Sequence, residues 1–369
     1  MDPKILPQSI SEEDNQLKFT LSGVNVSIAN SLRRVILSDI DTVVFKTYNE
    51  EVNKCNILEN TTGFNNEIVK QRMGCIPIHI TDLDTPIKDY VVEVDVENKT
   101  DTIQYVTTKD FKVRNKTTDK YLTENDRQNI FPPCDMTGYY IDFLRLKPKL
   151  SDEIPGEAIS LTCEFSIGNA KENGMFNVVS ACSYGFTVDD VKQEIELNKK
   201  KKEWKDQGMS PADIKFESEN WRLLDGLRIT KKDSFDFIVE SIGVFTNQEI
   251  CHKACDILIS KLNKVDATIG NDKLEIMESN TTMSNCFDVV LQDEDYTIGK
   301  AIEFVLYTKF YEGAEILSFC GFKKIHPHDT ESIIRLAYND VIDKDSIKGH
   351  IKISISELIQ IYNKIKESI

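Results

Sequence analysis

The cysteines and histidines carry the most distinctive chemistry in this chain, and their spacing predicts no metal site. Cys251, His252 and Cys255 fall in the segment CHKAC. On a helix His252 would point about 100° away from the face that the two cysteines share. His326 and His328 flank a proline, and none of the nine cysteines forms the Cys-x-x-Cys pair typical of a tetrahedral zinc site. We therefore expect Cys251 and Cys255 to be small buried residues of an amphipathic helix, and we expect no bound metal and no disulfide framework.

A catalytic site is not predicted either. The chain contains no glycine-rich phosphate loop, no Gly-x-Ser-x-Gly turn and no histidine pair at metal-binding helical spacing. The acidic run QDEDY at 292–296 is the best candidate, because clustered aspartates hold the metal ions of phosphoryl transfer. It precedes an amphipathic segment, however, where acidic side chains meet the positive end of a helix dipole. We interpret it as a helix start, and we expect no catalytic residues and no cofactor.

The charge balance favours protein partners over nucleic acid. The 369 residues include 61 acidic and 45 basic side chains, which gives a formal net charge of −16, whereas phosphate contacts need a basic face. The lysine run at 198–208 lies beside an acidic block, a pattern typical of a solvated helical excursion. No apolar run is long enough for a signal peptide or a membrane span. We therefore expect no strong direct nucleic acid contact and no membrane contact.

The elements that position charged side chains begin with the segment NVSIANSLRRVILSDI, residues 25–40. Its apolar residues have the spacing of a buried helix face, and they are Ile28, Leu32, Val35 and Ile36. Arg34 lies roughly opposite this stripe and Arg33 on its flank. We expect Ser27 to cap the helix. Alternating apolar residues before it predict a half-buried strand that contains Leu17, Phe19 and Leu21.

The same pattern recurs 270 residues later in the chain. The strand alternation returns at Phe287, Val289 and Leu291, and the helical stripe returns at Ile298, Ile302, Val305 and Leu306. All seven apolar positions coincide without a gap, which predicts an internal structural repeat. Such stripes need a partner, because four buried aliphatic side chains contribute about 6–12 kcal/mol, comparable to a domain's net stability. We expect the two helical stripes to form one internal dimer core.

Each copy is predicted to close with a strand and a helix. In the first copy these are residues 235–241 and a helix from about 247 to 264. In the second copy, residues 332–338 and 351–355 precede a helical stripe in 356–369. The first copy is much longer than the second, so it must contain inserted material.

These patterns predict an α+β fold of two dimerisation modules paired within one chain. Each module would be a small antiparallel sheet with two helices. The first would comprise residues 1–49 and 175–268, with a charged excursion at 187–232. A β-rich domain at 50–174 would be inserted in it, and the second module would span 269–369.

Several segments then carry a resemblance to a known family. They are NSLRRVILSDIDTVVF, NTTGFNNEIVKQRMGCIPIHI, YVTTKDF, GNAKENGMFNVVSACSY and FDFIVESIG. In this order they resemble the α-type subunit of cellular RNA polymerases, in its form as subunit 3 of the eukaryotic and archaeal enzymes. From about Leu274 onward, EDYTIGKAI and FCGFKKIHPHD are similar to the smaller α-like partner, subunit 11. The two stretches of resemblance cover most of the chain.

The resemblance implies a natural fusion of two α-like subunits, and hence α-subunit-like dimerisation modules. It implies a non-catalytic assembly platform of a DNA-directed RNA polymerase whose paired modules dock the two largest catalytic subunits. Small polymerase subunits of the 10 and 12 type are further partners that it suggests. Such fusions are a feature of large DNA viruses that replicate in the cytoplasm, which would place the protein in the virion and the host cytoplasm.

The resemblance also implies where partners bind. The outer face of the 25–40 helix would dock on the second-largest subunit through Arg33 and Arg34, whose planar guanidinium groups suit fixed polar contacts. Lys70, Gln71 and Arg72 would extend that surface. The second module would face the largest subunit.

The sequence departs from the family pattern in its cysteines. Many subunit 3 relatives carry a cysteine cluster for zinc or iron–sulfur, but Cys55, Cys75, Cys134 and Cys163 lack the paired spacing that such a cluster needs.

The alternative function is a stand-alone dimerising scaffold or transcription regulator with the α-like fold, since a fold alone does not determine function. A weaker alternative is an enzyme whose site lies in the β-rich insert.

Overall fold

The structure is a computed structural model that describes residues 2–151 and 153–369. It divides into two compact units. The first unit consists of residues up to Val35 together with Ala181–Glu240 and Cys251–Ile369, and the second consists of Ile36–Ser180 and Ser241–Ile250.

The first unit contains two sheets, and the first sheet is built around the strand predicted near the start of the chain. Its strands are β1 (Lys4–Ile5), β2 (Ser11–Glu13), β3 (Gln16–Ser22), β12 (Val179–Val188) and β13 (Thr230–Ser241). The order is β1-β3-β13-β12, and β2 also pairs with β3. Every second residue of β3 is buried, as the alternation predicts. Phe19 lies opposite Phe237 of β13, with their ring centroids 5.0 Å apart.

Two helices accompany this sheet, α1 (Val26–Ser38) and α6 (Asn247–Gly270). The predicted cap of α1 was wrong. The capping residue is Asn25, whose side-chain oxygen accepts a hydrogen bond from the backbone N–H of Ser27 at 2.9 Å. Ser27 itself lies in the first turn of the helix. The helix therefore begins earlier than we expected, because the asparagine side chain satisfies an N–H group that the first turn leaves without a helical partner.

The second sheet lies in the C-terminal part of the first unit. Its strands are β14 (Ile276–Glu278), β15 (Cys286–Gln292), β16 (Leu317–Lys323) and β17 (Glu331–Tyr338), in the order β14-β15-β17-β16. Its helices are α7 (Tyr296–Leu306), which continues into a π-helical turn (Tyr307–Gly313), and α8 (Lys344–Ser368). Residues 351–355, expected ahead of the closing helix, lie inside α8. Their apolar residues fit the helical stripe as well as a strand, and the short segment alone could not distinguish the two.

Both sheets share one topology. In each, the strand before the first helix pairs antiparallel with the last strand, and the middle strand lies on the far side of that last strand. The limits of β3 and β15 differ by 270 residues, and so do the first residues of α1 and α7. The last residues of β13 and β17 differ by 97 residues, as do the first residues of α6 and α8. We call β3, α1, β12, β13 and α6 the first repeat, and β15, α7, β16, β17 and α8 the second repeat.

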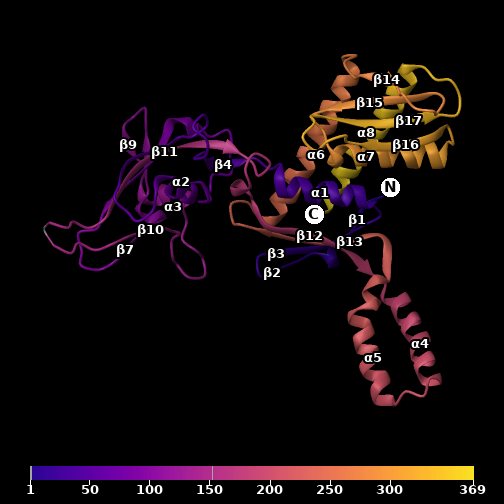
Figure 1. The fold of residues 1–369 in the computed structure, drawn as a ribbon, viewed down its shortest axis with the longest axis horizontal. Coiled ribbons are helices and arrows are strands. Elements are labelled where there is room, and N and C mark those ends of the chain that lie inside the picture. Colours follow the sequence, from indigo (N-terminus) through magenta and orange to yellow (C-terminus); the bar gives the residue numbers. More distant parts are fainter. Residues whose placement is uncertain (1, 152) are drawn as a thin grey trace. The chain divides into compact units, whose positions relative to one another are not determined.

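The charged excursion at 187–232 contains a helical hairpin of α4 (Asp190–Asp206) and α5 (Pro211–Leu223), which projects from the end of β12 and β13 (Figure 1). Ser210 caps α5, and a proline occupies its first position, where no helical N–H bond is lost. Leu197 is buried between mostly polar faces. A short 3-10 turn (Asp225–Arg228) leads back to the sheet.

The second unit is rich in strands, and the expected insert at 50–174 lies within it. Its larger sheet contains β4 (Thr42–Phe45), β5 (Cys55–Asn60), β6 (Tyr90–Glu97), β8 (Lys112–Asn115), β9 (Lys120–Tyr121) and β11 (Ala158–Gly168). The order is β4-β11-β6-β8-β9, with β5 also on β11. A separate pair joins β7 (Gln104–Thr107) to β10 (Asp142–Leu146).

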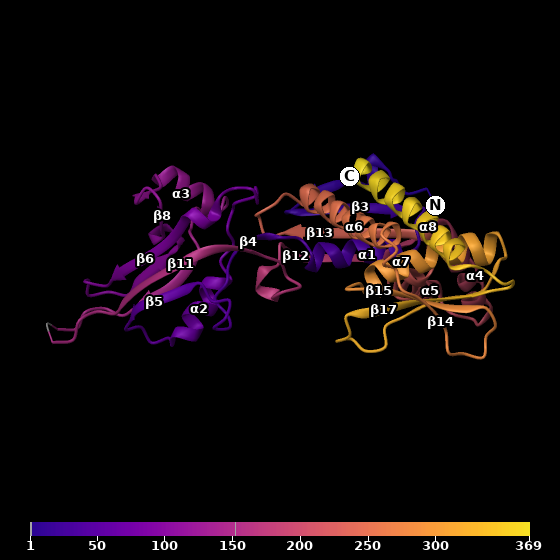
Figure 2. The ribbon, with the colours of Figure 1, turned by 90° about the horizontal axis from the view of Figure 1, so that it is seen from above.

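Two short helices flank the strands of the second unit, α2 (Asn66–Gly74) and α3 (Glu124–Ile130) (Figure 2). Short 3-10 turns complete the chain at Pro7–Ser9, Ile87–Asp89, Thr108–Asp110 and Gly174–Phe176. The core of this unit combines many aliphatic side chains with a cluster of phenylalanines. Phe45 stacks on Phe165, and Phe111 meets Phe131 and Phe143 edge-on at centroid distances of 5.4 and 5.5 Å. Such aromatic pairs stabilise a fold beyond the effect of the apolar area that they bury.

Candidate subunit-docking site

The apolar stripes predicted on the two repeat helices are buried. Each residue of the expected internal dimer core is at most 1% exposed, and these residues are Ile28, Leu32, Val35, Ile36, Ile298, Ile302, Val305 and Leu306. The charged and polar residues of α1 and α7 therefore determine what else these helices can contact.

The starts of α1 and α7 are built alike. Asn25 accepts from the backbone N–H of Ser27 at 2.9 Å, and Asp295 accepts from the backbone N–H of Thr297 at 2.8 Å. These residues occupy equivalent positions in the two repeats. Asp295 belongs to the acidic run that we interpreted as a helix start, and that interpretation is confirmed. The two caps differ in one respect, because only Asp295 carries a charge.

Arg34 forms its polar contacts with residues of this same chain. Its Nε donates to the hydroxyl of Thr297 at 2.9 Å, and its Nη2 lies 2.8 Å from a carboxylate oxygen of Asp295. The arginine side chain is 38% exposed. The guanidinium therefore connects α1 to the start of α7, an arrangement that the helical wheel of α1 alone could not indicate.

Arg33 makes a local contact instead. Its Nε and Nη2 donate to the side-chain oxygen of Asn30, one turn earlier in α1, at 3.1 and 2.9 Å. The side chain is partly exposed. Its planar group is thus oriented on the helix surface, where it can offer further donors to a partner.

Lys70, Gln71 and Arg72 lie on α2 in the second unit, whereas the arginine pair of α1 lies in the first. Arg72 donates to the backbone carbonyls of Phe143 and Asp142 at 2.6 and 3.0 Å, so it ties α2 to β10. Gln71 and Arg72 are exposed and Lys70 is half-buried. Of the two exposed side chains, Arg72 is held by its bonds to β10, so Gln71 is the one that we consider first for contact with a partner.

Two further contacts join the repeats, and sequence reasoning missed both. The hydroxyls of Ser31 in α1 and Tyr362 in α8 are 2.6 Å apart and buried. Burial raises the pKa of Tyr362, so the phenol stays protonated. Lys366 of α8 pairs with Asp256 of α6 at 2.6 Å. The chain separates the members of each pair by a hundred residues or more, so no local pattern could reveal them.

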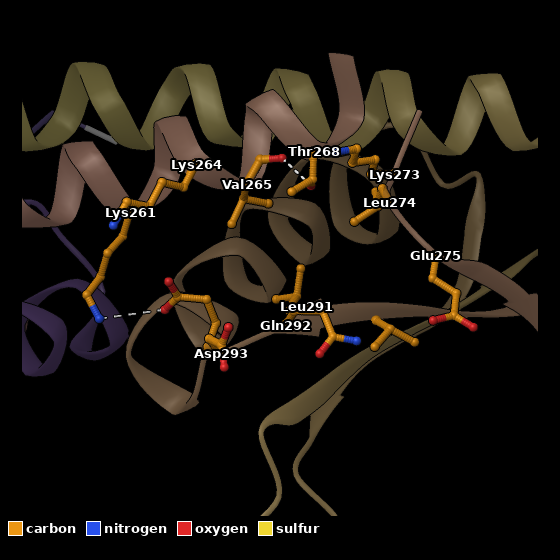
Figure 3. Close-up of a pocket in the computed structure, with 12 residues that line it drawn as sticks. Lys261, Lys264, Val265, Thr268, Lys273, Leu274, Glu275, Leu291, Gln292 and Asp293 are labelled. Carbon is orange, nitrogen blue, oxygen red and sulfur yellow. Dashed lines mark hydrogen bonds and ion pairs between the residues drawn. The ribbon is translucent and has the colours of Figure 1, made fainter. Parts of the chain in front are cut away.

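A cavity of about 430 Å³ lies between the C-terminal half of α6 and the end of β15 (Figure 3). Buried apolar side chains line part of it, namely Val265, Leu274, Val290 and Leu291. Near it the ammonium group of Lys261 approaches a carboxylate oxygen of Glu294 to 3.8 Å, which Figure 3 draws as a dashed line. Their side chains are only 16% and 10% exposed. This is another charged contact between the two repeats.

The residues with distinctive chemistry occupy structural positions. Cys251 and Cys255 are fully buried on α6, and burial raises the pKa of the Cys255 thiol to about 12. His326 and His328 lie in an exposed loop. Within residues 2–151 and 153–369, no group of three or more His, Cys, Asp or Glu side chains is arranged to hold a metal ion. In the same part of the chain no helix is long and apolar enough to cross a membrane.

The lysine run lies on α4, and two of its charges are balanced within the hairpin. Lys199 pairs with Glu196 at 2.5 Å and Lys200 pairs with Glu203 at 2.8 Å. Such exposed pairs contribute little to stability, but they neutralise part of the positive charge that a nucleic acid would contact.

Comparison with known proteins defines the class to which this architecture belongs. The RNA polymerase Rpb3/Rpb11 dimerisation domain matches residues 18–262, about two thirds of the chain. The chain therefore belongs to the family of Rpb3/Rpb11-type RNA polymerase subunits.

Individual relatives point to the same family. The subunit rpac1 of DNA-directed RNA polymerases I and III from Dictyostelium discoideum is 26% identical over 299 residues, which cover 71% of this chain and 81% of the relative. The subunit Rpo3 of DNA-directed RNA polymerase from Picrophilus torridus is 26% identical over 282 residues, covering 69% and 96%. The human subunit RPAC1 of RNA polymerases I and III is 23% identical over 301 residues, covering 69% and 83%.

Proposed function

We propose that the chain is a non-catalytic assembly subunit of a DNA-directed RNA polymerase in which a subunit 3-like part and a subunit 11-like part are joined. The observation that carries this proposal is the recurrence of one strand order, with one strand–helix spacing, in two parts of a chain that belongs to this family. The family match ends at residue 262, before the second sheet begins at Ile276. The second repeat would therefore supply the subunit 11-like partner.

The proposal includes a division into domains and a pairing of the repeats. The subunit 3-like module would comprise residues 1–49 and 175–268, the β-rich insert 50–174, and the subunit 11-like module 269–369. The buried contact between Ser31 and Tyr362 supports the pairing, because a hydroxyl pair that excludes water requires both helices to be in place.

The proposed partners are the largest and second-largest polymerase subunits, with small subunits of the 10 and 12 type as further candidates. Arg33 and Gln71 are the residues that we assign most directly to docking on the second-largest subunit, because Arg33 bonds within its own helix and Gln71 is exposed. Arg34 and Arg72 also hold the fold together, so they would support the docking surface as well as contribute to it.

The proposal extends to the origin of the polymerase. Two α-like modules in one chain fit the fused subunits of large DNA viruses that replicate in the cytoplasm, so we assign the protein to a viral polymerase in the virion and the host cytoplasm. The alternative remains a stand-alone dimerising scaffold or regulator, which would use the same fold without large partners.

Purification of the tagged full-length protein from its native source would test this function. We expect two very large chains to co-purify with it, and the eluate to synthesise RNA from a DNA template. A protein that elutes alone and without this activity would favour the scaffold alternative.

A single substitution tests the docking role. We expect Arg33→Glu to lower co-purification of the second-largest subunit about tenfold, because a reversed charge replaces the guanidinium donors, while the melting temperature stays unchanged. Arg34 is left intact, since its bond to Asp295 would confound the result. Lys202→Glu, at an exposed position on α4, is the matched control and should bind as the unchanged protein does. Equal binding by the Arg33→Glu protein would contradict the assigned role.

A further inference from the structure

The repeat spacing allows each contact between the repeats to be compared with its equivalent on the other side of the pair. Ser31 corresponds to Ala301 by the 270-residue offset, and Tyr362 corresponds to Val265 by the 97-residue offset. The first combination is a buried hydrogen bond of 2.6 Å. Its equivalent consists of two buried apolar side chains. One side of the pair is therefore polar where the other is apolar.

The second contact shows the same asymmetry. Arg34 meets Asp295 and Thr297 at 2.8 and 2.9 Å. Their equivalents in the opposite repeat are Phe304, Asn25 and Ser27, which carry no charge. An ion pair thus exists at one of two corresponding places.

The third contact joins α6 to the residue before the cap of α7, and it is asymmetric in the same way. Lys261 of α6 approaches Glu294 to 3.8 Å, and both side chains are largely buried. Their equivalents are Leu358 and Val24, each fully buried. Two basic side chains of the first repeat therefore meet two consecutive acidic residues at the start of α7.

We propose that these three contacts make the pairing selective: the first repeat accepts a partner of the second type and rejects a copy of itself. The inference rests on the proposed pairing of subunit 3-like and subunit 11-like modules. The partner that fits the first repeat presents two consecutive carboxylates ahead of its first helix and a phenol on its last helix.

The selectivity follows from what either wrong pairing would bury. Two copies of the first repeat would bring Ser31 against Val265 and Lys261 against Val24. Two copies of the second would bring Tyr362 against Ala301 and Glu294 against Leu358. Both cases place a largely buried charge against an apolar side chain, which is costly away from water. The second case also takes the buried Tyr362 phenol away from Ser31, whereas in the first case Ser31 keeps its 2.7 Å bond to the carbonyl oxygen of Ile28. Selectivity through such penalties is common at paired interfaces.

The experiment uses the full-length chain, cleaved after folding. A protease site replaces the exposed residues 271–273 between α6 and β14, and the dissociation constant of the two cleaved halves is measured by dilution. Lys261→Glu and Glu294→Lys are each expected to raise this constant at least about tenfold, and the double variant to restore most of the loss. Ser31→Ala and Tyr362→Phe form a second cycle. Ser31→Ala should weaken association because it removes the partner of the buried Tyr362 phenol, Tyr362→Phe should cost less because Ser31 keeps its bond to the carbonyl of Ile28, and the double change should recover most of the loss.

Lys264→Glu is the matched control, since Lys264 lies on the same helix near the cavity and forms no ion pair with any residue that the structure describes (Figure 3). It should leave the dissociation constant unchanged. If the halves stay associated at every dilution, the same two cycles are read from the urea unfolding midpoint of the intact chain. Additive cycles, or first halves that self-associate as tightly as they bind second halves, would overturn the inference.

The outcomes separate this inference from the proposed function. Additive cycles in a protein that still co-purifies with the large polymerase chains would refute the selectivity alone. Coupled cycles in a protein that never meets those chains would leave the selectivity standing and refute the assembly role.

Discussion

Replacing Gly299 by alanine should destabilise the protein, although alanine is the better helix former. Gly299 lies in α7, one turn after the cap at Asp295, and a Cβ atom there would overlap the ring of Phe322 on β16. The same ring meets Tyr296 edge-on, with centroids 5.0 Å apart at 72°. The substitution therefore forces Phe322 out of the position in which it packs α7 against the second sheet.

The expected magnitude combines three effects. Alanine gains about 1 kcal/mol in helix propensity over glycine. Overpacking costs about 1–3 kcal/mol, and displacing a half-buried aromatic ring forfeits about 1–2 kcal/mol of apolar burial. The free energy of unfolding should therefore fall by about 1–4 kcal/mol in the Gly299→Ala protein.

Gly349 in α8 provides the matched control. A Cβ atom at Gly349 would meet nothing within 4 Å, so Gly349→Ala should raise the free energy of unfolding by up to about 1 kcal/mol. Urea unfolding followed by circular dichroism, with the slope compared between variants, measures both values. The same chemical change should have opposite signs at the two sites. A Gly299→Ala protein that matches the Gly349→Ala protein in stability would refute the packing argument.

Two further predictions concern charge in the first unit. Leu32→Asp should lower the free energy of unfolding by more than about 4 kcal/mol, because it buries an unpaired carboxylate, while Leu223→Asp, at a site 71% exposed, should leave thermal melting nearly unchanged. Arg335, 2.6 Å from Asp288, holds the pKa of that carboxyl below its usual range. The ion pair therefore stabilises the fold above the unfolded-state pKa near 4, and its contribution is lost as the pH falls through the lower folded-state pKa. Asp288→Asn should thus reduce stability at neutral pH and approach the unchanged protein in acid, and a gap that is constant with pH in urea titrations would exclude this account.

The repeat helices could be predicted from the chain because their burial is periodic. Each inner residue of α1 lies on one stripe, and the same stripe begins 270 residues later in α7. β3 could be predicted equally well, because one of its faces is buried and the other is only partly buried. In β15 the pattern is weaker. Phe287 is partly exposed, while Asp288 and Val290 are buried on the opposite face, so covering on both faces blurs the alternation.

The pairing of distant segments could not be predicted. In the second unit β11 pairs with β6 along its first seven residues, and with β4 along its last four. Such registers depend on which strands meet, and local alternation does not contain that information. Arg34 illustrates the same limit at a single site. On the wheel of α1 it lies away from the buried stripe, and its role depends on Asp295, 261 residues further on.

The connection between α6 and β14 determines how the two repeats associate. Only the residues between Gly270 and Ile276 separate α6 from β14, and both repeats belong to one compact unit apart from a few terminal residues of α1, β12, β13 and α6. Joined by so short a tether, each repeat meets the other at an effective concentration on the order of millimolar. Their association then no longer depends on how much protein the cell makes. In the proposed fused subunit every molecule carries one copy of each module, so translation of one chain fixes a one-to-one ratio that two separate genes would have to balance.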